Sequence, residues 1–325
     1  MTDPSYGIQC PACKFAFKVK PEWAGRTGRC PQCKGPMVIP SPPAVPGAAP
    51  IVAAAPAAKP SGSPPAVQAI AGAAQMDLSS LRSPNESLLR TVCLVFAILI
   101  YLALLVSIVG IFYFGIIVAA SWIGLAIHLC HVRGNGIRVG RDQLPQVYAS
   151  ACRAAKALGL AEVPEVYVIQ QGGMLNAFAT KWAFRNYIVL YSDLVDACGD
   201  DSGELDMIVA HEMGHLALKH ITWHWILLPA MMVPFLSQAY SRACEYSADR
   251  CGWTGCRNKQ AAMRGLVILA AGGHCGRMAS LEAFLKQRHE VDGFWQIVVG
   301  LFSTHPWLTH RVEAVSQMAP SQPQA

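Results

Sequence analysis

The sequence predicts an α+β fold that is mainly helical and has a small β-sheet, preceded by a cysteine-rich ribbon and a helical hairpin that crosses a membrane. Three observations predict it. Two C-x2-C pairs occur within the first 40 residues, a run of 42 residues between Arg90 and Arg133 carries no formal charge, and strand-like segments later occur among helix-like ones. Hydrophobic residues make up 53% of the chain and charged residues 14%, which is unusually apolar for a soluble protein.

Residues 1–40 are expected to form a small zinc ribbon. Cys10, Cys13, Cys30 and Cys33 form two C-x2-C pairs with sixteen residues between them, a spacing typical of a structural zinc site. A unit of this size buries too little apolar surface to fold alone, so the metal would supply the stability. The other eight cysteines lack such spacing and are expected to be reduced thiols in a reducing compartment.

The ribbon is basic, but its charge does not identify a nucleic-acid-binding module. Four thiolates around a zinc ion carry negative charge, and the lysines and arginines nearby partly offset it. The formal net charge of the whole chain, +6, is modest and spread out. We expect the ribbon to bind a protein partner or to be a structural appendage, with nucleic-acid binding as the less favoured alternative.

Residues 41–83 are rich in Pro, Ala, Gly and Ser, which predicts a disordered linker. The uncharged run that follows is about twice as long as one membrane-crossing helix, which needs ~20 residues. We therefore predict a transmembrane helical hairpin over residues 84–131 that turns near Gly110 to Gly115. Arginines flank both ends and none lies at the tip, so both ends are expected to face the cytoplasm. The N-terminal residues lack the pattern of a secretory signal.

Residues 132–317 are expected to form the main globular domain, followed by a disordered tail over 318–325. The segments "PEVYVIQ" (164–170) and "RNYIVLYSD" (185–193) are enriched in β-branched and aromatic residues and are predicted strands. "NAFAT" (176–180) lies between them on a third short strand or its loop. Helical periodicity dominates beyond Asp193.

One predicted helix of this domain carries the pattern of a catalytic metal site, "HEMGH". His211 and His215 are four residues apart, so they lie on one helix face, where both imidazoles can bind one zinc ion. Glu212 would lie beside the metal without being a ligand, the position needed to take a proton from zinc-bound water. Two such histidines can also be ordinary core or surface residues. His220, five residues after His215, lies on a different face and is not expected to be a ligand.

A second predicted helix, "SRACEYSADR", supplies carboxylates at the same spacing. A His2Glu zinc site takes a carboxylate from a separate element and leaves one position open for water, so Glu245 is the predicted third ligand. Asp249, one turn further along, is a candidate to hold the second nitrogen of a ligating histidine. An ordinary ion pair with an arginine is the alternative for Asp249.

Four motifs in this order, "NAFAT", "HEMGH", "RACEYSAD" and "STHPWLTHRV", resemble the HtpX and CAAX-prenyl-protease group of membrane zinc metallopeptidases. The resemblance covers roughly residues 132–316 and extends to the preceding hydrophobic hairpin. It implies a zincin-like fold and a gluzincin endopeptidase with one catalytic zinc ion, besides the structural zinc of the ribbon. His211, His215 and Glu245 would be the ligands and Glu212 the general base and acid.

The resemblance also implies roles for three further residues. Asn176 would lie beside the edge strand along which such enzymes align an extended substrate. His305 and Arg311 match the C-terminal motif and could stabilise the oxyanion. A structural His-Pro turn, and an ion pair of Arg311 with Asp249 or Glu313, are the alternatives. The chain has fewer apolar segments than the CAAX prenyl proteases, which argues against processing of prenylated peptides.

Together these features predict a membrane-anchored zinc metalloendopeptidase that acts on unfolded or membrane-proximal polypeptides. Its expected location is the bacterial cytoplasmic membrane, with the ribbon and the peptidase domain on the cytosolic face. The alternative is a catalytically silent, zinc-binding scaffold or adaptor that recruits a partner through the ribbon.

Residues 221–241 contain no formally charged side chain, although metal-ligand motifs lie on both sides of them. A single span would place these motifs across a ~30 Å hydrocarbon layer, whereas ligands of one zinc lie about 2 Å from it. We therefore predict that the active-site helix continues to about Leu228, that the chain turns between Pro229 and Pro234, and that this apolar hairpin dips into one leaflet. Trp223 and Trp225 would lie near the headgroups. Burial in the protein core is the alternative.

Overall fold

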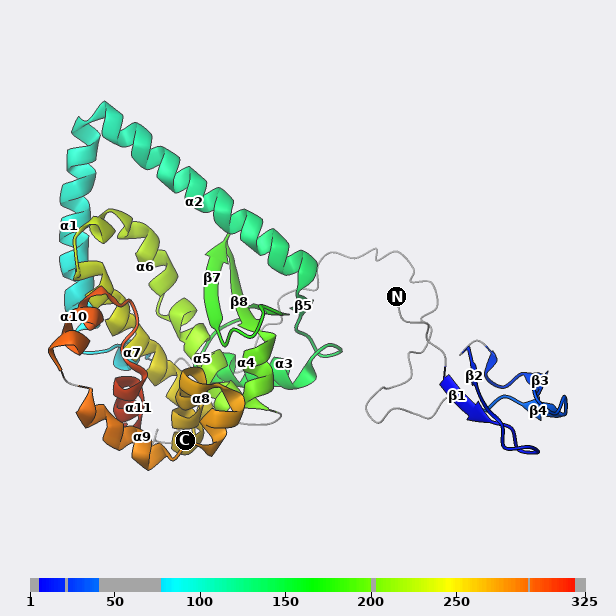
Figure 1. The fold of residues 1–325 in the computed structure, drawn as a ribbon. Coiled ribbons are helices and arrows are strands. Elements are labelled where there is room, and N and C mark those ends of the chain that lie inside the picture. Colours follow the sequence, from blue (N-terminus) through cyan, green and yellow to red (C-terminus); the bar gives the residue numbers. More distant parts are fainter. Residues whose placement is uncertain (1–5, 21–22, 41–76, 200–202, 292, 319–325) are drawn as a thin grey trace. The chain divides into compact units, whose positions relative to one another are not determined.

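A computed structural model describes residues 6–20, 23–40, 77–199, 203–291 and 293–318 of the 325-residue chain (Figure 1). The chain divides into two compact units, Met1–Pro64 and Pro65–Ala325. Most of the predicted linker, residues 41–76, lies outside the described residues, and so does the predicted tail from residue 319 onward.

The described residues of the N-terminal unit form two antiparallel β-hairpins. Strand β1 (Tyr6–Gln9) pairs with β2 (Ala16–Val19), and β3 (Thr27–Arg29) pairs with β4 (Pro36–Val38). Each hairpin turn carries one C-x2-C pair and closes in the same way: the backbone amides of Lys14 and Lys34, both at positive φ, donate to the carbonyls of Cys10 and Cys30. The repeated turn geometry directs all four thiols toward one another.

Two long apolar helices, α1 (Glu86–Val106) and α2 (Ile108–Asn135), form the predicted hairpin and diverge from their connection (Figure 1). Both are long and apolar enough to cross a membrane, which confirms that part of the prediction. The turn lies at Ser107 rather than near Gly110 to Gly115. The Ser107 side chain accepts a hydrogen bond from the Gly110 amide at 3.0 Å and so caps α2. This N-cap, and not the glycines that follow it, determines where the second helix starts.

Residues 77–83, assigned to the linker by composition, are ordered against the main domain. They form a 3-10 turn, η2 (Leu78–Leu81), in which the side chain of Asp77 accepts a hydrogen bond from the Ser79 amide. Leu78 and Leu81 pack against the core. The amide of Ser83 donates to Ser247 at 2.7 Å, so this segment fixes the start of α1.

The second unit contains a four-stranded sheet in the order β5-β6-β8-β7. Strand β5 (Ile137–Arg138) pairs antiparallel with β6 (Glu165–Ile169), which runs parallel to β8 (Arg185–Tyr191). Strand β7 (Ala177–Trp182), which includes most of "NAFAT", is antiparallel to β8 and lies at the edge (Figure 1). Both predicted strands are therefore present as β6 and β8.

Helices cover both faces of the sheet, and successive residues of each strand pack against the helices of opposite faces. Val166, Val168, Ile188 and Leu190 share a core with α3 (Pro145–Ala157), α4 (Ser192–Cys198) and α5 (Gly203–Ala217). The intervening residues Tyr167, Ile169, Tyr187 and Val189 pack against Leu129 and Val132 near the end of α2. This period of two is that of a strand buried on both faces.

The described residues after α5 form helices and the turns that connect them. The chain continues through α6 (His220–Ile226), η3 (Leu228–Met232), α7 (Leu236–Cys256) and α8 (Lys259–Met278) to α9 (Leu281–Gln287), η4 (Arg288–Glu290), α10 (Phe294–Phe302) and α11 (Leu308–Ser316). Helices α5 and α7 approach closely because small residues line their contact: a Cβ on Gly214 would lie 2.6 Å from Cys251 Cβ. This contact brings the two predicted ligand helices together.

The apolar segment 221–241 is a hairpin, as expected, but its first helix is interrupted. Helix α5 ends at Ala217, and Lys219 adopts the left-handed conformation (φ 60°) before α6 begins, so the active-site helix does not continue to Leu228. The chain turns through η3, and α7 returns toward the site. Leu227 and Ala230 are buried against Cys93 and Ala97 of α1.

Candidate metal centre

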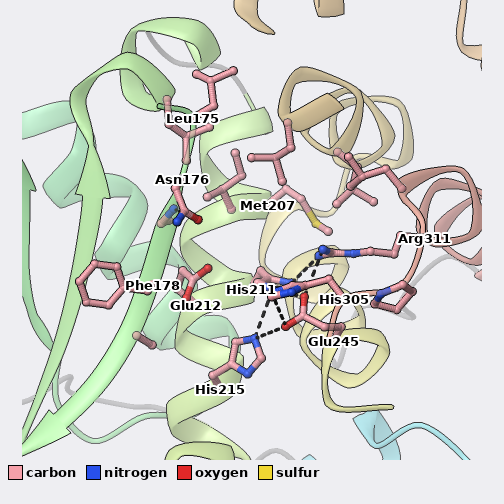
Figure 2. Close-up of a pocket in the computed structure, with 18 of the residues that line it drawn as sticks. Leu175, Asn176, Phe178, Met207, His211, Glu212, His215, Glu245, His305 and Arg311 are labelled. Atoms are coloured by element: carbon pink, nitrogen blue, oxygen red, sulfur yellow. Dashed lines mark hydrogen bonds and ion pairs between the residues drawn. The ribbon is translucent and has the colours of Figure 1, made fainter. Parts of the chain in front are cut away.

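Two helices bring three predicted ligands to one point (Figure 2). His211 and His215 come from α5 and Glu245 comes from α7. The two Nε2 atoms are 3.2 Å apart, and each lies 3.5 Å from an oxygen of Glu245. Donors bound at about 2.0–2.1 Å in a tetrahedral arrangement lie about 3.3–3.4 Å from one another. The donor set therefore fits a zinc ion.

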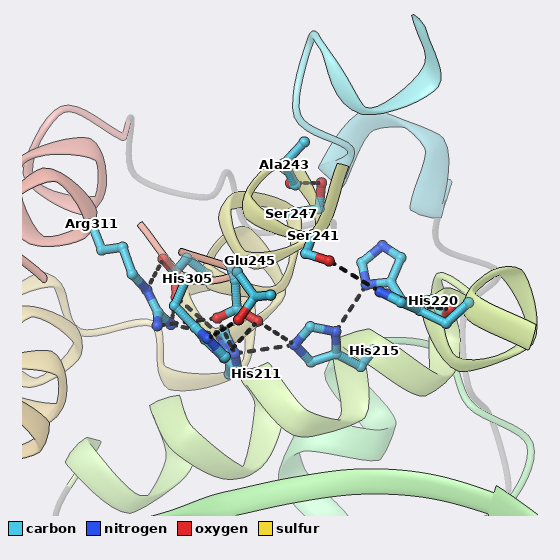
Figure 3. Close-up of polar contacts among 12 residues, drawn as sticks. His211, His215, His220, Ser241, Ala243, Glu245, Ser247, His305 and Arg311 are labelled. Atoms are coloured by element: carbon cyan, nitrogen blue, oxygen red, sulfur yellow. Dashed lines mark hydrogen bonds and ion pairs between the residues drawn. The ribbon is translucent and has the colours of Figure 1, made fainter. Parts of the chain in front are cut away.

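A buried network holds His211 from behind (Figure 3). Its Nδ1 lies 3.0 Å from Asp249 Oδ1, which leaves Nε2 for a metal. Arg311 donates through Nε and Nη2 to Asp249 at 2.9 and 2.7 Å, and its Nη1 lies 3.1 Å from Glu245. The guanidinium of Arg311 thus faces both carboxylates. Its ion pair with Asp249 is the alternative that the sequence left open for these two residues.

The pKa values of these groups follow from burial and from their charged neighbours. Burial opposes the charge on Glu245 and Asp249, but the nearby Arg311 and the hydrogen-bonded His211 hold the pKa of both carboxyls below the ordinary value. For His211, hydrogen bonds to Asp249 and Glu245 outweigh burial and raise the pKa to about 10. Burial keeps the pKa of His215 well below its ordinary value. A metal at His211 Nε2 would therefore compete with a proton.

Glu212 lies beside the donors and under the edge strand. Its side chain is almost fully buried, and burial raises its pKa to about 7, with the charge of His211 opposing the shift. A carboxyl with a pKa near 7 can both accept and return a proton. A hydrogen bond with the backbone of Ala179 in β7 lowers the pKa slightly and places Glu212 between strand and donors.

A cavity of about 390 Å³ opens over these residues. Phe178 of strand β7 lies on one side of the cavity and Met207 of α5 on another (Figure 2). Ala177, Ala179 and Leu266 also line it. Asn176 lines the cavity at the start of β7, where its Oδ1 accepts the amide of Ala177 at 2.9 Å. An extended chain beside β7 would therefore pass over Glu212.

His305 also lines the cavity, from the loop before α11. Its side chain is 66% exposed, and its Nε2 lies 3.6 Å from Glu245 Oε1. Its Nδ1 lies 3.0 Å from the hydroxyl of Thr304. His305 is the exposed imidazole of the site, whereas Arg311 is buried behind the carboxylates.

Sequence reasoning missed the role of His220. The change of direction at Lys219 turns His220 back toward the site, so its Nδ1 lies 3.0 Å from His215 Nδ1 (Figure 3). A continuous helix would have placed these residues on different faces. The sequence signal is weak, because no glycine or proline marks the break in the helix before His220.

The ribbon cysteines form a second candidate site within their own unit. Cys10 and Cys33 have Sγ atoms 3.8 Å apart, and the sulfurs of Cys13 and Cys30 are 3.6 Å apart. Four thiolates bound tetrahedrally at about 2.3 Å would be about 3.8 Å apart. The four thiols therefore fit a structural zinc ion, as their spacing predicted.

An HExxH helix, a third ligand from a neighbouring helix and an edge strand over the site define the HExxH metallopeptidase class. The model of peptidase family M48 matches residues 142–233 and 221–319, more than half of the chain. The chain belongs to this family, which confirms the resemblance carried by the four motifs. The plastoglobule-localized metallopeptidase 48, chloroplastic, of Arabidopsis thaliana is 27% identical over 178 residues, 49% of this chain and 50% of that protein. The chain thus spans about half the length of this curated relative.

Proposed function

We propose that this protein is a membrane-anchored zinc metalloendopeptidase that hydrolyses peptide bonds of unfolded or membrane-proximal polypeptides. The proposal rests on three metal-donor atoms that lie 3.2–3.5 Å from one another. The buried Glu212 lies beside them, and strand β7 lines the same cavity. His211, His215 and Glu245 would hold the catalytic zinc, and the four ribbon cysteines would hold a structural one.

The chemistry follows from the position of each side chain. When bound, zinc polarises the substrate carbonyl and makes water a better nucleophile. Glu212 accepts a proton from the attacking water and passes it to the leaving amine. The polypeptide adds to the free edge of β7, beside Asn176. His305, at the mouth of the cavity, donates to the oxyanion.

Arg311 differs from the role that the resemblance implied. Its side chain is 6% exposed, and all three of its guanidinium nitrogens face Asp249 or Glu245. We therefore propose that Arg311 holds these carboxylates in place and that it does not stabilise the oxyanion directly. Asp249 in turn fixes the tautomer of His211.

Replacement of Glu212 by Gln tests the activity. The amide keeps the size of the side chain but cannot accept the proton, so hydrolysis of an unfolded protein substrate should fall by at least about 100-fold, while zinc content stays unchanged. Comparison of membrane proteomes that contain wild-type or Glu212→Gln protein would then identify substrates. Undiminished hydrolysis by the variant would contradict the mechanism, and a zinc-loaded wild-type protein without any hydrolysis would favour the scaffold alternative.

Contacts with α1 set the depth of the apolar hairpin 221–241. The guanidinium of Arg90 lies 5.0 Å from the ring of Trp223, and Tyr101 Oη donates to the carbonyl of Ile226 at 3.2 Å. Arg90 and Tyr101 are separated by about 16 Å along α1, at 1.5 Å per residue. Ile226 would therefore lie near the middle of a ~30 Å hydrocarbon layer. We propose that α6 and η3 insert into the same leaflet as α1.

Cysteine accessibility tests this insertion. Met232 of η3 is 75% exposed in the protein, and Met278, at the end of α8, is 74% exposed. Native cysteines such as Cys275 are exposed, so labelling of each variant is compared with that of the wild-type protein. In native membranes Met232→Cys should add no labelling by a water-soluble maleimide, because lipid covers the new thiol, whereas Met278→Cys should add one labelled thiol. Equal reactivity of both would argue against insertion. Positive charges at both ends of the α1–α2 hairpin favour a cytosolic peptidase domain and ribbon in a bacterial cytoplasmic membrane.

A further inference from the structure

A row of buried side chains continues from His215 to the first turn of α1. His215 Nδ1 lies 3.0 Å from His220 Nδ1 (Figure 3), and His220 Nε2 lies 3.4 Å from Glu86 Oε1. Both His220 and Glu86 are fully buried. One residue at the start of a membrane helix is therefore two contacts away from the metal donors.

Metal binding at His215 Nε2 would fix every proton along this row. A coordinated nitrogen carries no proton, so neutral His215 must be protonated at Nδ1, which then donates to His220 Nδ1. His220 must consequently carry its own proton on Nε2. That atom makes no hydrogen bond of ordinary geometry within the described residues, and Glu86 Oε1 is an acceptor within reach.

Glu86 is held firmly in this position. Arg82 contacts Oε1, Arg90 lies 4.0 Å from the same oxygen, and Ser247 of α7 donates to Oε2 at 2.5 Å. Arg82 also donates to the carbonyl of Leu218, between α5 and α6, at 2.8 Å. These contacts fix the first turn of α1 to the segment that carries His215 and His220.

A separate metal ion is the competing explanation, because Glu86, His220 and Cys244 lie close enough to share one. A metal at His220 Nε2 would leave the proton of that ring on Nδ1. Nδ1 would then face the protonated Nδ1 of His215, and two donors would meet at 3.0 Å. Arg82 and Arg90 would also repel a divalent cation beside Glu86. The hydrogen-bonded row is therefore the consistent arrangement.

We propose that Glu86 and His220 are positioning residues of the catalytic metal site. They hold His215 in the tautomer and orientation that bind zinc, as Asp249 does for His211 through a single contact. This inference rests on the zinc site of the proposed function. It makes the first turn of α1 a part of the metal centre in addition to part of a membrane anchor.

Zinc affinity of the full-length protein in detergent, measured by chelator competition, tests the proposal without reference to peptidase activity. The catalytic zinc is the fraction that a His211→Ala protein lacks. Glu86→Leu, which removes the acceptor for His220 Nε2, and His220→Phe should each weaken its affinity about 10–100-fold. The double variant should lose no more than the weaker-binding single variant, because both changes interrupt one row. Tyr101→Phe removes a different hydrogen bond between α1 and α6 and is the matched control, with wild-type affinity expected.

The thermal midpoint of the metal-free proteins separates positioning from folding. Wild-type zinc affinity in a folded Glu86→Leu protein would overturn the proposal, and so would an equal loss of affinity in Tyr101→Phe. A further bound metal that disappears in Cys244→Ser would also overturn it. If Glu86→Leu or His220→Phe shows no thermal transition, His220→Leu takes its place: weakened zinc affinity would support the proposal, and wild-type affinity would overturn it. A wild-type protein that contains no zinc sensitive to His211→Ala would instead refute the proposed zinc site itself.

Discussion

The most direct test of the charge network is replacement of Arg311 by Met. The change leaves Asp249 and Glu245, which are 0% and 8% exposed, without their guanidinium partner. Removal of one partner from a buried ion pair costs about 3–5 kcal/mol, because the remaining charge stays desolvated. For a domain of this size, 1 kcal/mol shifts the melting temperature by about 2–4 °C. We therefore expect the metal-free protein to melt about 6–20 °C lower, as measured by scanning fluorimetry in detergent.

The chain provides a matched control for this measurement. Arg153 makes the same two-pronged contact with Asp206, at 2.9 and 2.7 Å, but its side chain is 49% exposed. Exposed ion pairs contribute about 0.2–1 kcal/mol, so Arg153→Met should shift melting by less than about 4 °C. Zinc should reduce the Arg311→Met shift, because its charge partly replaces the guanidinium beside Glu245. Equal shifts for the two variants, or a larger Arg311→Met shift with zinc, would refute this account of the network.

Three further predictions concern packing, the substrate edge and the ribbon. Gly214→Ala should lower the free energy of unfolding by about 1–3 kcal/mol and should lower the zinc content, because the new methyl group would push α7 and Glu245 away from α5. Gly124→Ala is the control: a Cβ there would meet nothing within 4 Å, so this variant should melt at the wild-type temperature. Lys181→Pro removes an amide from the outer edge of β7 on the same side as Ala179, so KM for unfolded substrates should rise several-fold with kcat little changed; a loss confined to kcat would contradict strand addition. Cys13→Ser should remove one zinc ion per chain, as measured by elemental analysis, and leave peptide hydrolysis intact; lost hydrolysis would mean that the ribbon takes part in catalysis.

Local sequence patterns were sufficient for the features that depend on short spacings. The i, i+4 histidines, the C-x2-C pairs and the β-branched strands depend on regular geometry that a few residues determine. The turn of the membrane hairpin was predicted at the wrong place, because it depends on a capping serine, and the break after α5 was not predicted, because it depends on the left-handed Lys219. The contact between Glu86 and His220 joins residues 134 positions apart, as their numbers show, so only the tertiary fold could reveal it.

The contacts of α1 also relate the zinc site to the bilayer surface. Glu86 and Arg90 are the last charged residues before the uncharged run, so the first turn of α1 would lie at the headgroups if α1 crosses the membrane. His220 touches this turn and His215 touches His220, which places the metal donors at about the same level. Polypeptide segments that emerge from the bilayer would meet the β7 edge without being pulled far from the membrane. Spacer residues inserted between the membrane span of a substrate and its unfolded segment test this placement. The number of residues from the membrane span to the cleaved bond should stay constant, because the active site stays at a fixed height above the bilayer. Cleavage that moves away from the bilayer by the length of the spacer would contradict it.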